Sequence, residues 1–478
     1  MLQPGLGWVP LWPSKVVPIA EHLAYLKRAG RPSRDSLETY VAQGGDVIRV
    51  FLDECHARNL VPFISMRMND MHHIMRGNSE PDPAKREAAM AEFQFFADHP
   101  EWRLGDSYPS KGSRAVLDWA NKPVRDHRIA ILREVCENYD IDGLELDFMR
   151  AYVYFNPKRT PLAERRAIMT DFVRQVRQLL DRTARGGKHR WLCVRIPGYG
   201  VSYDEAGIDL AAFCHSGVEM VNVSGHYFTD QQLEIAMIRR QVPPHVAIYA
   251  EMQFVTAIGT APVSAVPGGM QRAVNRRTTD AQFYTTAALA YARGADGVSA
   301  FNFQYYRGTY SKNDVDGKSL EPPFGIFAHL ADRKWLAAQP QNFFLGYQWD
   351  TPHRPGRPFY LHPAKVGQPQ TLTYDLVAPA GGWRGPARLR IQARNSLGDS
   401  QWKAAFNGVE LAPSDNVAEF PPAPYDTAIG KPEDYRAWTI PVELLQEGAN
   451  RVDVTLLHGT TAQLFYSDIS FPETGSAK

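Results

Sequence analysis

The sequence predicts an α/β protein in two parts: a (β/α)8-type TIM barrel, incomplete at its N-terminus, followed by an antiparallel β-sandwich. Three observations lead to this fold class. Short apolar runs alternate with longer amphipathic segments between residues 60 and 340. Polar and charged residues gather at the ends of those runs. From about Gln339, helical periodicity stops and turn residues become frequent. We therefore expect a barrel domain over residues 1–340 and a sandwich domain over residues 341–478.

Each apolar run in the barrel region has the length of a buried strand. The expected strands are Leu60–Met68, Gly143–Met149, Trp191–Ile196, Glu219–Ser224, Val246–Met252 and Gly297–Phe303. Between them, apolar residues recur every three or four positions, which indicates helices. The clearest helices are Pro123–Tyr139, Ala163–Leu180 and Asp280–Arg293. This alternation favours a parallel sheet with helices outside it.

The N-terminal region is short for a complete barrel. A closed barrel needs eight strands, and the residues before Leu60 do not suffice for two complete strand–helix units. One further strand is expected within Leu6–Leu11. The first strand–helix unit is therefore expected to be missing or degenerate, which would leave the barrel open.

The C-terminal region has the pattern of a sandwich, with short strands separated by turns. The expected strands are Thr371–Val377, Ala387–Ala393, Trp402–Phe406, Ala437–Ile440, Asn450–Leu457 and Ala462–Ser470. Residues 440–452 resemble a strand, a short turn and the next strand of the accessory sandwiches in carbohydrate-active enzymes. Such a domain would bind carbohydrate or brace the barrel. The sequence shows no exposed aromatic row, which favours the structural role.

Composition narrows the classes of function. The formal net charge is +1 and no run of like charges appears, so neither nucleic acid nor a membrane is an expected partner. No apolar stretch approaches the ~20 residues that span a bilayer. No signal peptide is visible, so we expect a cytoplasmic protein, or a secreted one whose leader is absent from this chain. The cysteines form no Cys-x-x-Cys pair and are expected as buried thiols. The sequence indicates no oligomeric state.

The most informative stretch is residues 141–150, Ile-Asp-Gly-Leu-Glu-Leu-Asp-Phe-Met-Arg. In a strand, Glu145 and Asp147 share one face, while three apolar residues share the other. Burying an unpaired charge is costly, so such a face lines a site or carries paired charges. Asp147 lies at the strand's C-terminal end, where barrel enzymes place catalytic groups, and Arg150 follows it. The alternatives are an edge strand with a solvated acidic face, or a structural Asp–Arg pair.

The same alternation directs polar residues inward on the other barrel strands. The inward positions include Ser65, Cys193, Asn222, Ser224, Tyr249 and Gln253. The residues that we expect to contact substrate are Arg67, Asn69, Asp70, Glu145, Arg150, Arg195, His226, Tyr227, Asn302 and Tyr305. A purely structural ion network would use many of the same residues. Their concentration toward one end of the strands favours a site.

Two carboxylates on opposing strands are what glycoside hydrolysis requires. One is protonated to expel the leaving oxygen, and the other is ionised to attack the sugar or to activate water. We predict Asp147 and Glu251 as this catalytic pair, because each lies at the C-terminal end of a strand. Glu145, two residues deeper, is expected to tune or orient them. The sequence leaves open which carboxylate is the acid, which sugar is cleaved, and whether the configuration is retained.

The arginines at the strand ends bear on the substrate. Arg binds carboxylate and sulfate groups in a bidentate manner, so Arg67, Arg150 and Arg195 suggest an acidic or sulfated sugar. The same arginines would also balance the carboxylates.

Two rival functions use the same residues. A metal-dependent lyase or isomerase would bind its metal through Asp70, His72 or His73, His226 and Glu251, although no HxH or HxxxH spacing is present. We therefore predict neither a metal nor a cofactor. The other rival is a barrel that binds glycans without cleaving them. A carbohydrate is the expected partner in the glycosidase and glycan-binding readings.

Three segments resemble the glycosyl-hydrolase-like family 10 proteins, which are barrels related to glycoside hydrolases. Residues 139–148, Tyr-Asp-Ile-Asp-Gly-Leu-Glu-Leu-Asp-Phe, are similar to the family's fourth strand. Residues 63–70, Phe-Ile-Ser-Met-Arg-Met-Asn-Asp, and residues 294–302 are similar to its third and eighth strands. The resemblance covers about residues 40–335. It implies a barrel that acts on glycans with Asp147 in the active site.

On this alignment Glu251 belongs to the seventh strand. Many retaining barrel glycosidases place their two carboxylates on strands four and seven, which matches Asp147 and Glu251. The chain departs from the family at its short N-terminus, where the first strand should be. The resemblance implies a class of reaction and no particular substrate.

Overall fold

A computed structural model describes residues 1–30, 35–262, 271–307, 321–346, 363–393, 396–418 and 432–471. These residues form two compact units. Unit one contains Met1–Asn222 and Met237–Ala247, and unit two contains Val223–Ala236 and the described residues from Ile248 onward. Three elements span the division: strand β6 (Met220–Ser224), helix α11 (Ile235–Gln241) and strand β7 (Ala247–Met252).

Unit one contains three parallel strands with an apolar outer face: β3 (Phe63–Arg67), β4 (Gly143–Asp147) and β5 (Trp191–Pro197). Their register pairs Ile64 with Leu144 and Leu144 with Leu192, and all three side chains are fully buried. The alternate positions carry the polar groups. This is the two-residue period that the sequence predicts.

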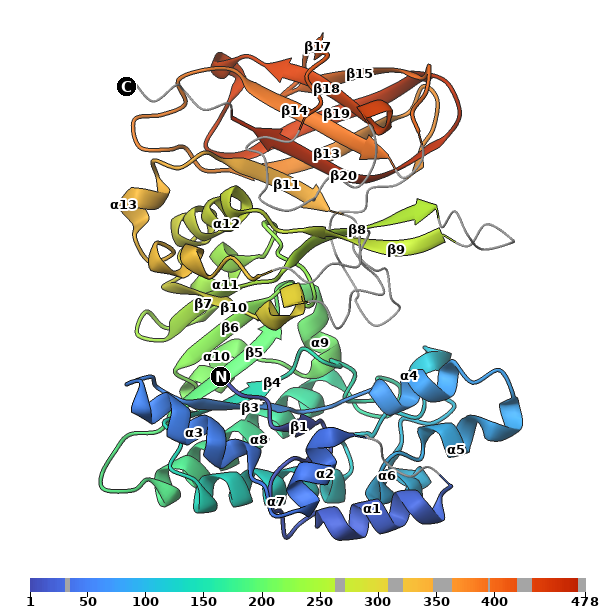
Figure 1. The fold of residues 1–478 in the computed structure, drawn as a ribbon, viewed down its shortest axis with the longest axis vertical. Coiled ribbons are helices and arrows are strands. Elements are labelled where there is room, and N and C mark those ends of the chain that lie inside the picture. Colours follow the sequence, from blue (N-terminus) through green and yellow to red (C-terminus); the bar gives the residue numbers. More distant parts are fainter. Residues whose placement is uncertain are drawn as a thin grey trace. The chain divides into compact units, whose positions relative to one another are not determined.

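Two long helices connect these strands, α7 (Lys122–Asn138) and α8 (Leu162–Thr183) (Figure 1). Both were predicted within three residues of these bounds. Their buried residues recur at helical spacing, as Phe172, Val176 and Leu179 do on α8. The other helices of unit one are α1 (Ile19–Arg28), α2 (Ser36–Ala42), α3 (Val47–Ala57), α4 (His72–Asn78), α5 (Arg86–Met90), α6 (Gln94–Asp98), α9 (Tyr203–Ala206) and α10 (Leu210–His215).

The N-terminus forms a small hairpin instead of the expected barrel strand. Its strands are β1 (Gly5–Leu6) and β2 (Val9–Pro10), which pair antiparallel. The prediction of a barrel strand within Leu6–Leu11 is therefore wrong, because the chain reverses at Gly7, whose φ is 63°. Leu2 instead pairs with the edge of β3, where its N–H donates to the carbonyl of Phe63 at 3.0 Å.

Unit two contains two further parallel strands, β7 (Ala247–Met252), which begins at the last residue of unit one, and β10 (Gly297–Ala300). The predicted strand Gly297–Phe303 ends three residues early. Asn302 has a φ of 55°, which a strand does not accommodate, and a 3-10 turn begins at Phe303. Helix α12 (Asp280–Ala292) precedes β10 and starts with a capping box from Thr279. A hairpin of β8 (Val255–Pro262) and β9 (Gln271–Arg277) follows β7.

Two antiparallel sheets complete unit two (Figure 1, orange to red). One sheet has the order β11 (Asn342–Gly346), β20 (Ala462–Ser470), β14 (Ala387–Ala393), β18 (Tyr435–Ile440) and β17 (Ala412–Ser414), with β12 (Pro363–Ala364) beside β20. The other has the order β13 (Pro369–Leu376), β19 (Gly448–His458), β15 (Gln401–Phe406) and β16 (Val409–Glu410). All six predicted strands of this region form.

The inner faces of the two sheets share one apolar core, as the sandwich prediction requires. Leu389 and Ile391 of β14 belong to the same buried cluster as Leu372 of β13 and Val454 of β19. Within unit two, polar contacts also join the sheets to α12: Gln282 donates from Nε2 to Asn342 Oδ1 at 3.0 Å and to the Tyr466 hydroxyl at 2.7 Å.

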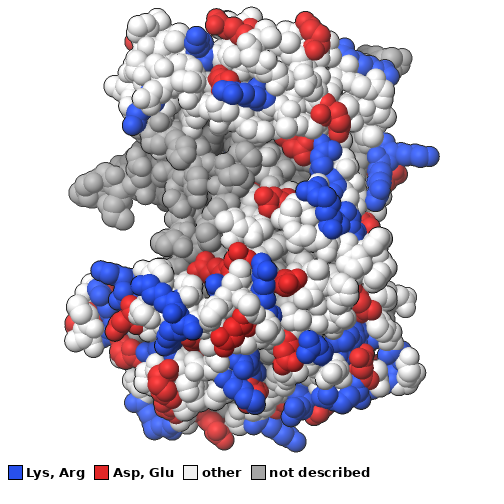
Figure 2. Space-filling view, turned by 180° about the vertical axis from the view of Figure 1, so that it is seen from behind, with Lys and Arg blue, Asp and Glu red and all other residues white. Residues whose placement is uncertain are grey.

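The α/β class and the antiparallel sheets are thus as predicted, and each of the six predicted parallel strands forms. The closed eight-stranded barrel and the domain boundary at residue 340 stay predictions. Within the described ranges, no helix is both long and apolar enough to cross a membrane. On the face that Figure 2 shows, basic and acidic side chains are interspersed.

Candidate active site

Glu145 is the centre of a buried polar cluster in unit one. Its Oε1 lies 2.6 Å from Ser65 Oγ of β3, and its Oε2 accepts from Asn222 Nδ2 of β6 at 3.1 Å. The thiol of Cys193 on β5 lies 3.7 Å from Oε2. All four positions were predicted to face inward, and their contacts confirm it. Burial, with a smaller contribution from the charge of Asp147, raises the pKa of Glu145.

Asp147, at the C-terminal end of β4, is paired with an arginine. In the strand register it lies between Arg67 on β3 and Arg195 on β5. Its Oδ1 accepts from Arg195 Nη1 at 3.0 Å and from the backbone N–H of Met149 at 2.8 Å. Both charged side chains are 1% exposed, so the ion pair compensates two buried charges. None of the described residues donates to Oδ2, which leaves this oxygen as the one that could face a substrate.

A chain of four polar side chains extends from Arg67. Arg67 Nη1 donates to Asp70 Oδ2 at 2.7 Å, and His72 Nδ1 lies 2.7 Å from Asp70 Oδ1. His72 Nε2 lies 2.8 Å from Arg150 Nη2. Because arginine can only donate, Nε2 accepts, and the imidazole is neutral with its hydrogen on Nδ1. Burial acts to raise the pKa of Asp70, but the hydrogen bond from His72 and the charge of Arg67 outweigh it and hold that pKa well below its usual range.

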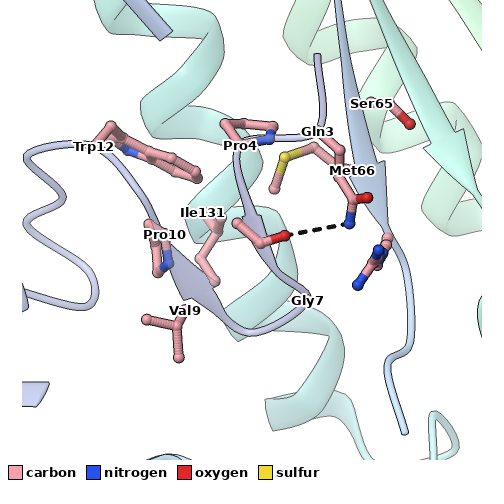
Figure 3. A pocket seen from close by; sticks show the side chains of 11 residues that line it. Gln3, Pro4, Gly7, Val9, Pro10, Trp12, Ser65, Met66 and Ile131 are labelled. Atoms are coloured by element: carbon pink, nitrogen blue, oxygen red, sulfur yellow. Dashed lines mark hydrogen bonds between the residues drawn. The ribbon is translucent and has the colours of Figure 1, made fainter. Parts of the chain in front are cut away.

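The N-terminal hairpin borders this chain. A side chain at Gly7 would place its Cβ 2.3 Å from the Cβ of Asp70, and the Gly7 carbonyl accepts from the fully buried Arg128 at 2.7 Å. Figure 3 shows a small pocket between the hairpin and β3, with Ser65 and Arg67 among its lining residues. Its volume of about 10 Å³ is roughly the room of one water molecule. No pattern in the sequence indicates that the hairpin lies beside Asp70.

Asn69 follows β3 and braces a loop. Its Nδ2 donates to the carbonyl of Val153 at 2.9 Å, and the side chain is 1% exposed. This contact ties the loop after β3 to the loop after β4. A role for Asn69 in substrate binding stays a prediction.

His73 is buried among aromatic rings. Its ring lies edge-on to Phe93 at 5.0 Å and to Phe96 at 4.5 Å between centroids, and it is 3% exposed. Burial lowers the pKa of His73 to about 3. In the unfolded chain a histidine takes up its proton below about pH 6.5. The contribution of neutral His73 to stability is therefore fully present above pH 6.5 and is lost as the pH falls toward 3, by up to about 1.4 kcal/mol per pH unit.

We expect His73→Phe, which keeps an aromatic ring in this packing, to make the protein less sensitive to acid. Urea unfolding at pH 7 and at pH 4.5 measures the effect. The free energy of unfolding lost between the two pH values should be about 2 kcal/mol smaller in the variant than in the wild type. An equal loss in both proteins would show that folded His73 is protonated in this range.

Glu251 on β7 is the centre of a second cluster, in unit two. Its Oε1 accepts from Ser224 Oγ at 2.5 Å and from Gln253 Nε2 at 2.8 Å, and its side chain is 1% exposed. Gln253 Nε2 also donates to the carbonyl of His226 at 2.7 Å. His226 has a φ of 69°, and its ring lies 4.3 Å from the ring of Tyr227. The inward positions predicted for Ser224, Glu251 and Gln253 are confirmed.

The two remaining predicted site residues lie beyond the end of β10. Asn302 occupies the left-handed turn described above, so its predicted place on a strand is wrong. Tyr305 lies in the following 3-10 turn and packs edge-on against the ring of Phe254 at 5.4 Å. Contact of either residue with a substrate stays a prediction.

The structure therefore gathers the predicted residues into two clusters. The unit-one cluster contains Arg67, Asp70, Glu145, Asp147, Arg150 and Arg195, and the unit-two cluster contains His226, Tyr227 and Glu251. The pairing of Asp147 with Glu251 stays a prediction. His72 and Gln253 also contact these clusters. Gln253 was predicted only as an inward-facing position, from its two-residue spacing from Glu251, and His72 only as a ligand of the rival metal site.

The rival metal site requires at least three ligand side chains close together. Asp70 and His72 are in contact, but within the described ranges no group of three or more His, Cys, Asp or Glu side chains could hold a metal ion.

Comparisons with known proteins identify no family. No protein-family model matches the chain, and no curated protein matches it. The resemblance to the glycosyl-hydrolase-like family 10 proteins therefore stays an interpretation of three motifs.

Solved structures of chitinases are similar in part. Chitinase ChiA74 from Bacillus thuringiensis is 10% identical with a TM-score of 0.40, over 98% of this chain and 90% of that one. Chitinase ChiW from Paenibacillus sp. str. FPU-7 is 11% identical with a TM-score of 0.39, over 97% of this chain and 52% of that one. Catalytic domain 2 of the Ostrinia furnacalis Group II chitinase is 11% identical with a TM-score of 0.31, over 45% and 72%. TM-scores this low carry no functional argument.

Proposed function

We propose that the protein is a glycoside hydrolase that acts on an oligo- or polysaccharide, with Asp147 and Glu251 as its catalytic carboxylates. The observation that carries the proposal is Asp147 itself. It is a buried carboxylate at the C-terminal end of a parallel strand, with one oxygen fixed by Arg195 and Met149 and the other without a donor among the described residues. In a purely structural ion pair, both oxygens of a buried carboxylate would be expected to accept hydrogen bonds.

The surroundings of the two carboxylates suggest different roles. Asp147 has a cationic partner that compensates its charge, so we assign it the ionised role of nucleophile or base. Glu251 is held through Oε1 by the hydroxyl of Ser224 and the amide of Gln253. Because Asp147 takes the ionised role, we assign Glu251 the complementary role of proton donor to the leaving oxygen. Glu145, fixed by three strands around it, would hold β4 in place beneath Asp147 and act as a positioning residue.

The assignment of Glu251 is tested with two classes of glycoside that differ in the pKa of the leaving group. A leaving group of low pKa departs without a proton, whereas a sugar or alkyl leaving group needs the acid. We expect Glu251→Gln to lower kcat by about 10²–10⁴-fold on substrates with poor leaving groups, and far less on dinitrophenyl glycosides. Steady-state rates on both anomers of a glycoside panel measure this.

Glu164→Gln serves as the matched control, since Glu164 lies exposed in the first turn of α8. Its rates should equal those of the wild type. If Glu251→Gln retains full turnover on poor leaving groups, Glu251 is not the acid. If the wild type cleaves no member of the panel and no natural polysaccharide, the proposed function fails.

A further inference from the structure

Arg67 and Arg150 lie close together in unit one, at the ends of β3 and β4. His72 and Asp70 connect them through hydrogen bonds of 2.7 and 2.8 Å. Burial, and next the charge of Arg150, lowers the pKa of Arg67. Two guanidinium groups held this close repel each other, and the charges of Asp70 and Asp147, which raise the pKa of Arg67, offset part of that repulsion.

The hydrogen bonding of Arg67 is incomplete. Its side chain is only 10% exposed, and the described residues accept from Nη1 alone. Nε is buried with no acceptor among them. A buried donor without a partner costs about 1–3 kcal/mol. Arg67 is therefore placed to donate to a group that the described residues do not supply.

Nearby acceptors within unit one are largely occupied. Both oxygens of Asp70 are used, one by Arg67 itself and the other by His72. Asp147 Oδ1 is used by Arg195 and Met149, while Oδ2, which the proposed function reserves for the sugar, accepts from none of the described residues. A water molecule or a sugar hydroxyl could satisfy the donor but would not offset the repulsion that Asp70 and Asp147 leave between the two cations. An anionic oxygen would do both.

We infer that the glycan bound beside Asp147 carries a carboxylate or sulfate group, which accepts from Arg67 and lies against Arg150. The inference rests on the proposed function and names the class of its substrate. From the sequence, Arg67, Arg150 and Arg195 were all assigned to the anionic sugar. We keep only the first two, because Arg195 is bound to Asp147. The side chain of His72, which lies between Asp70 and Arg150, is 41% exposed, so solvent reaches this series of hydrogen-bonded side chains from the side where we place the anionic group of the sugar.

The test compares matched substrates on the full chain. Aryl glucuronides, aryl 6-O-sulfated glucosides and plain aryl glucosides are assayed as both anomers. We expect the wild type to prefer one of the two anionic classes over the neutral one. We expect Arg67→Gln to lower the ratio of kcat/KM for anionic over neutral substrate by about 10–100-fold, and Arg67→Lys to restore part of it. Arg174→Gln, which changes an exposed arginine on α8, should leave the ratio unchanged.

A binding measurement keeps the inference separate from turnover. Calorimetric titration of the wild type with glucuronate, glucose 6-sulfate and glucose should show binding of an anionic sugar that Arg67→Gln and Arg150→Gln each weaken about tenfold or more. Arg150 follows the strand, so its variant tests the site even if Arg67→Gln does not fold. Thermal unfolding of each variant identifies such a failure.

The outcomes separate the two proposals. Cleavage of neutral substrates with no preference for anionic ones would overturn the inference and leave the glycosidase proposal standing. Arginine-dependent binding of an anionic sugar without any cleavage would support the inference as a binding property and overturn the glycosidase proposal. The preferred class, glucuronide or sulfated glucoside, identifies the anion.

Discussion

Asp147→Asn is expected to lower kcat on a glycoside substrate by about 10³-fold or more. Asparagine has nearly the same shape and can still accept from Arg195 and Met149 through Oδ1. It cannot attack a sugar carbon or take a proton from water at any useful rate, because it lacks the negative charge. The loss should therefore lie in kcat, with the substrate still bound. Steady-state kinetics with a dinitrophenyl glycoside measures it, because that leaving group needs no acid.

Asp140→Asn is the matched control for this prediction. Asp140 lies just before the same strand, and its side chain is 46% exposed, 3.9 Å from Arg190. Its rate should stay within about twofold of the wild-type rate, as for most surface substitutions. An Asp147→Asn protein that unfolds at the wild-type temperature and retains full turnover would show that Asp147 is structural.

Asp468→Ala is expected to destabilise the protein by about 3–5 kcal/mol. Arg390 and Asp468 face each other in the register of β14 and β20 and form two hydrogen bonds, Nε to Oδ1 at 3.0 Å and Nη2 to Oδ2 at 2.5 Å. Their exposed fractions are 1% and 0%. Removing the carboxylate leaves the guanidinium buried without its counter-charge. Urea unfolding followed by tryptophan fluorescence gives the change in the free energy of unfolding.

The double variant Arg390→Met with Asp468→Leu separates the loss of charge balance from the loss of packing. Replacing both charges by apolar side chains of similar volume is often neutral or stabilising in other proteins. We expect it to recover most of the stability that Asp468→Ala loses. A single variant that costs under about 1 kcal/mol would mean that water reaches this pair.

The strands were predictable because burial on one face imposes a period of two on the sequence. Two strands of the sandwich, Ala387–Ala393 and Ala462–Ser470, form with the predicted bounds. The errors lie where the backbone leaves the extended region. Asn302 takes a left-handed φ, and Gly7 reverses the chain. A hydrophobic pattern does not encode either turn.

Only part of the candidate site was predictable from the sequence, for the same reason. The cluster around Glu145 was predictable, because each member occupies an alternate position on a strand. The role of His72 was not, because the conformation of the loop after β3 decides where its ring points. The pairing of Asp147 with Glu251 depends on how whole strands are arranged. Alternation within each strand carries no information on that arrangement.

The position of β20 has a consequence for biosynthesis. Every strand that it pairs with, β11, β12 and β14, precedes it in the chain. A ribosome therefore delivers those strands before the one that joins them, and their unpaired edges wait in the meantime. Nascent chains halted before Ala462 should consequently recruit chaperones. Synonymous codons that slow translation just upstream would lengthen this exposure and lower the yield of native protein.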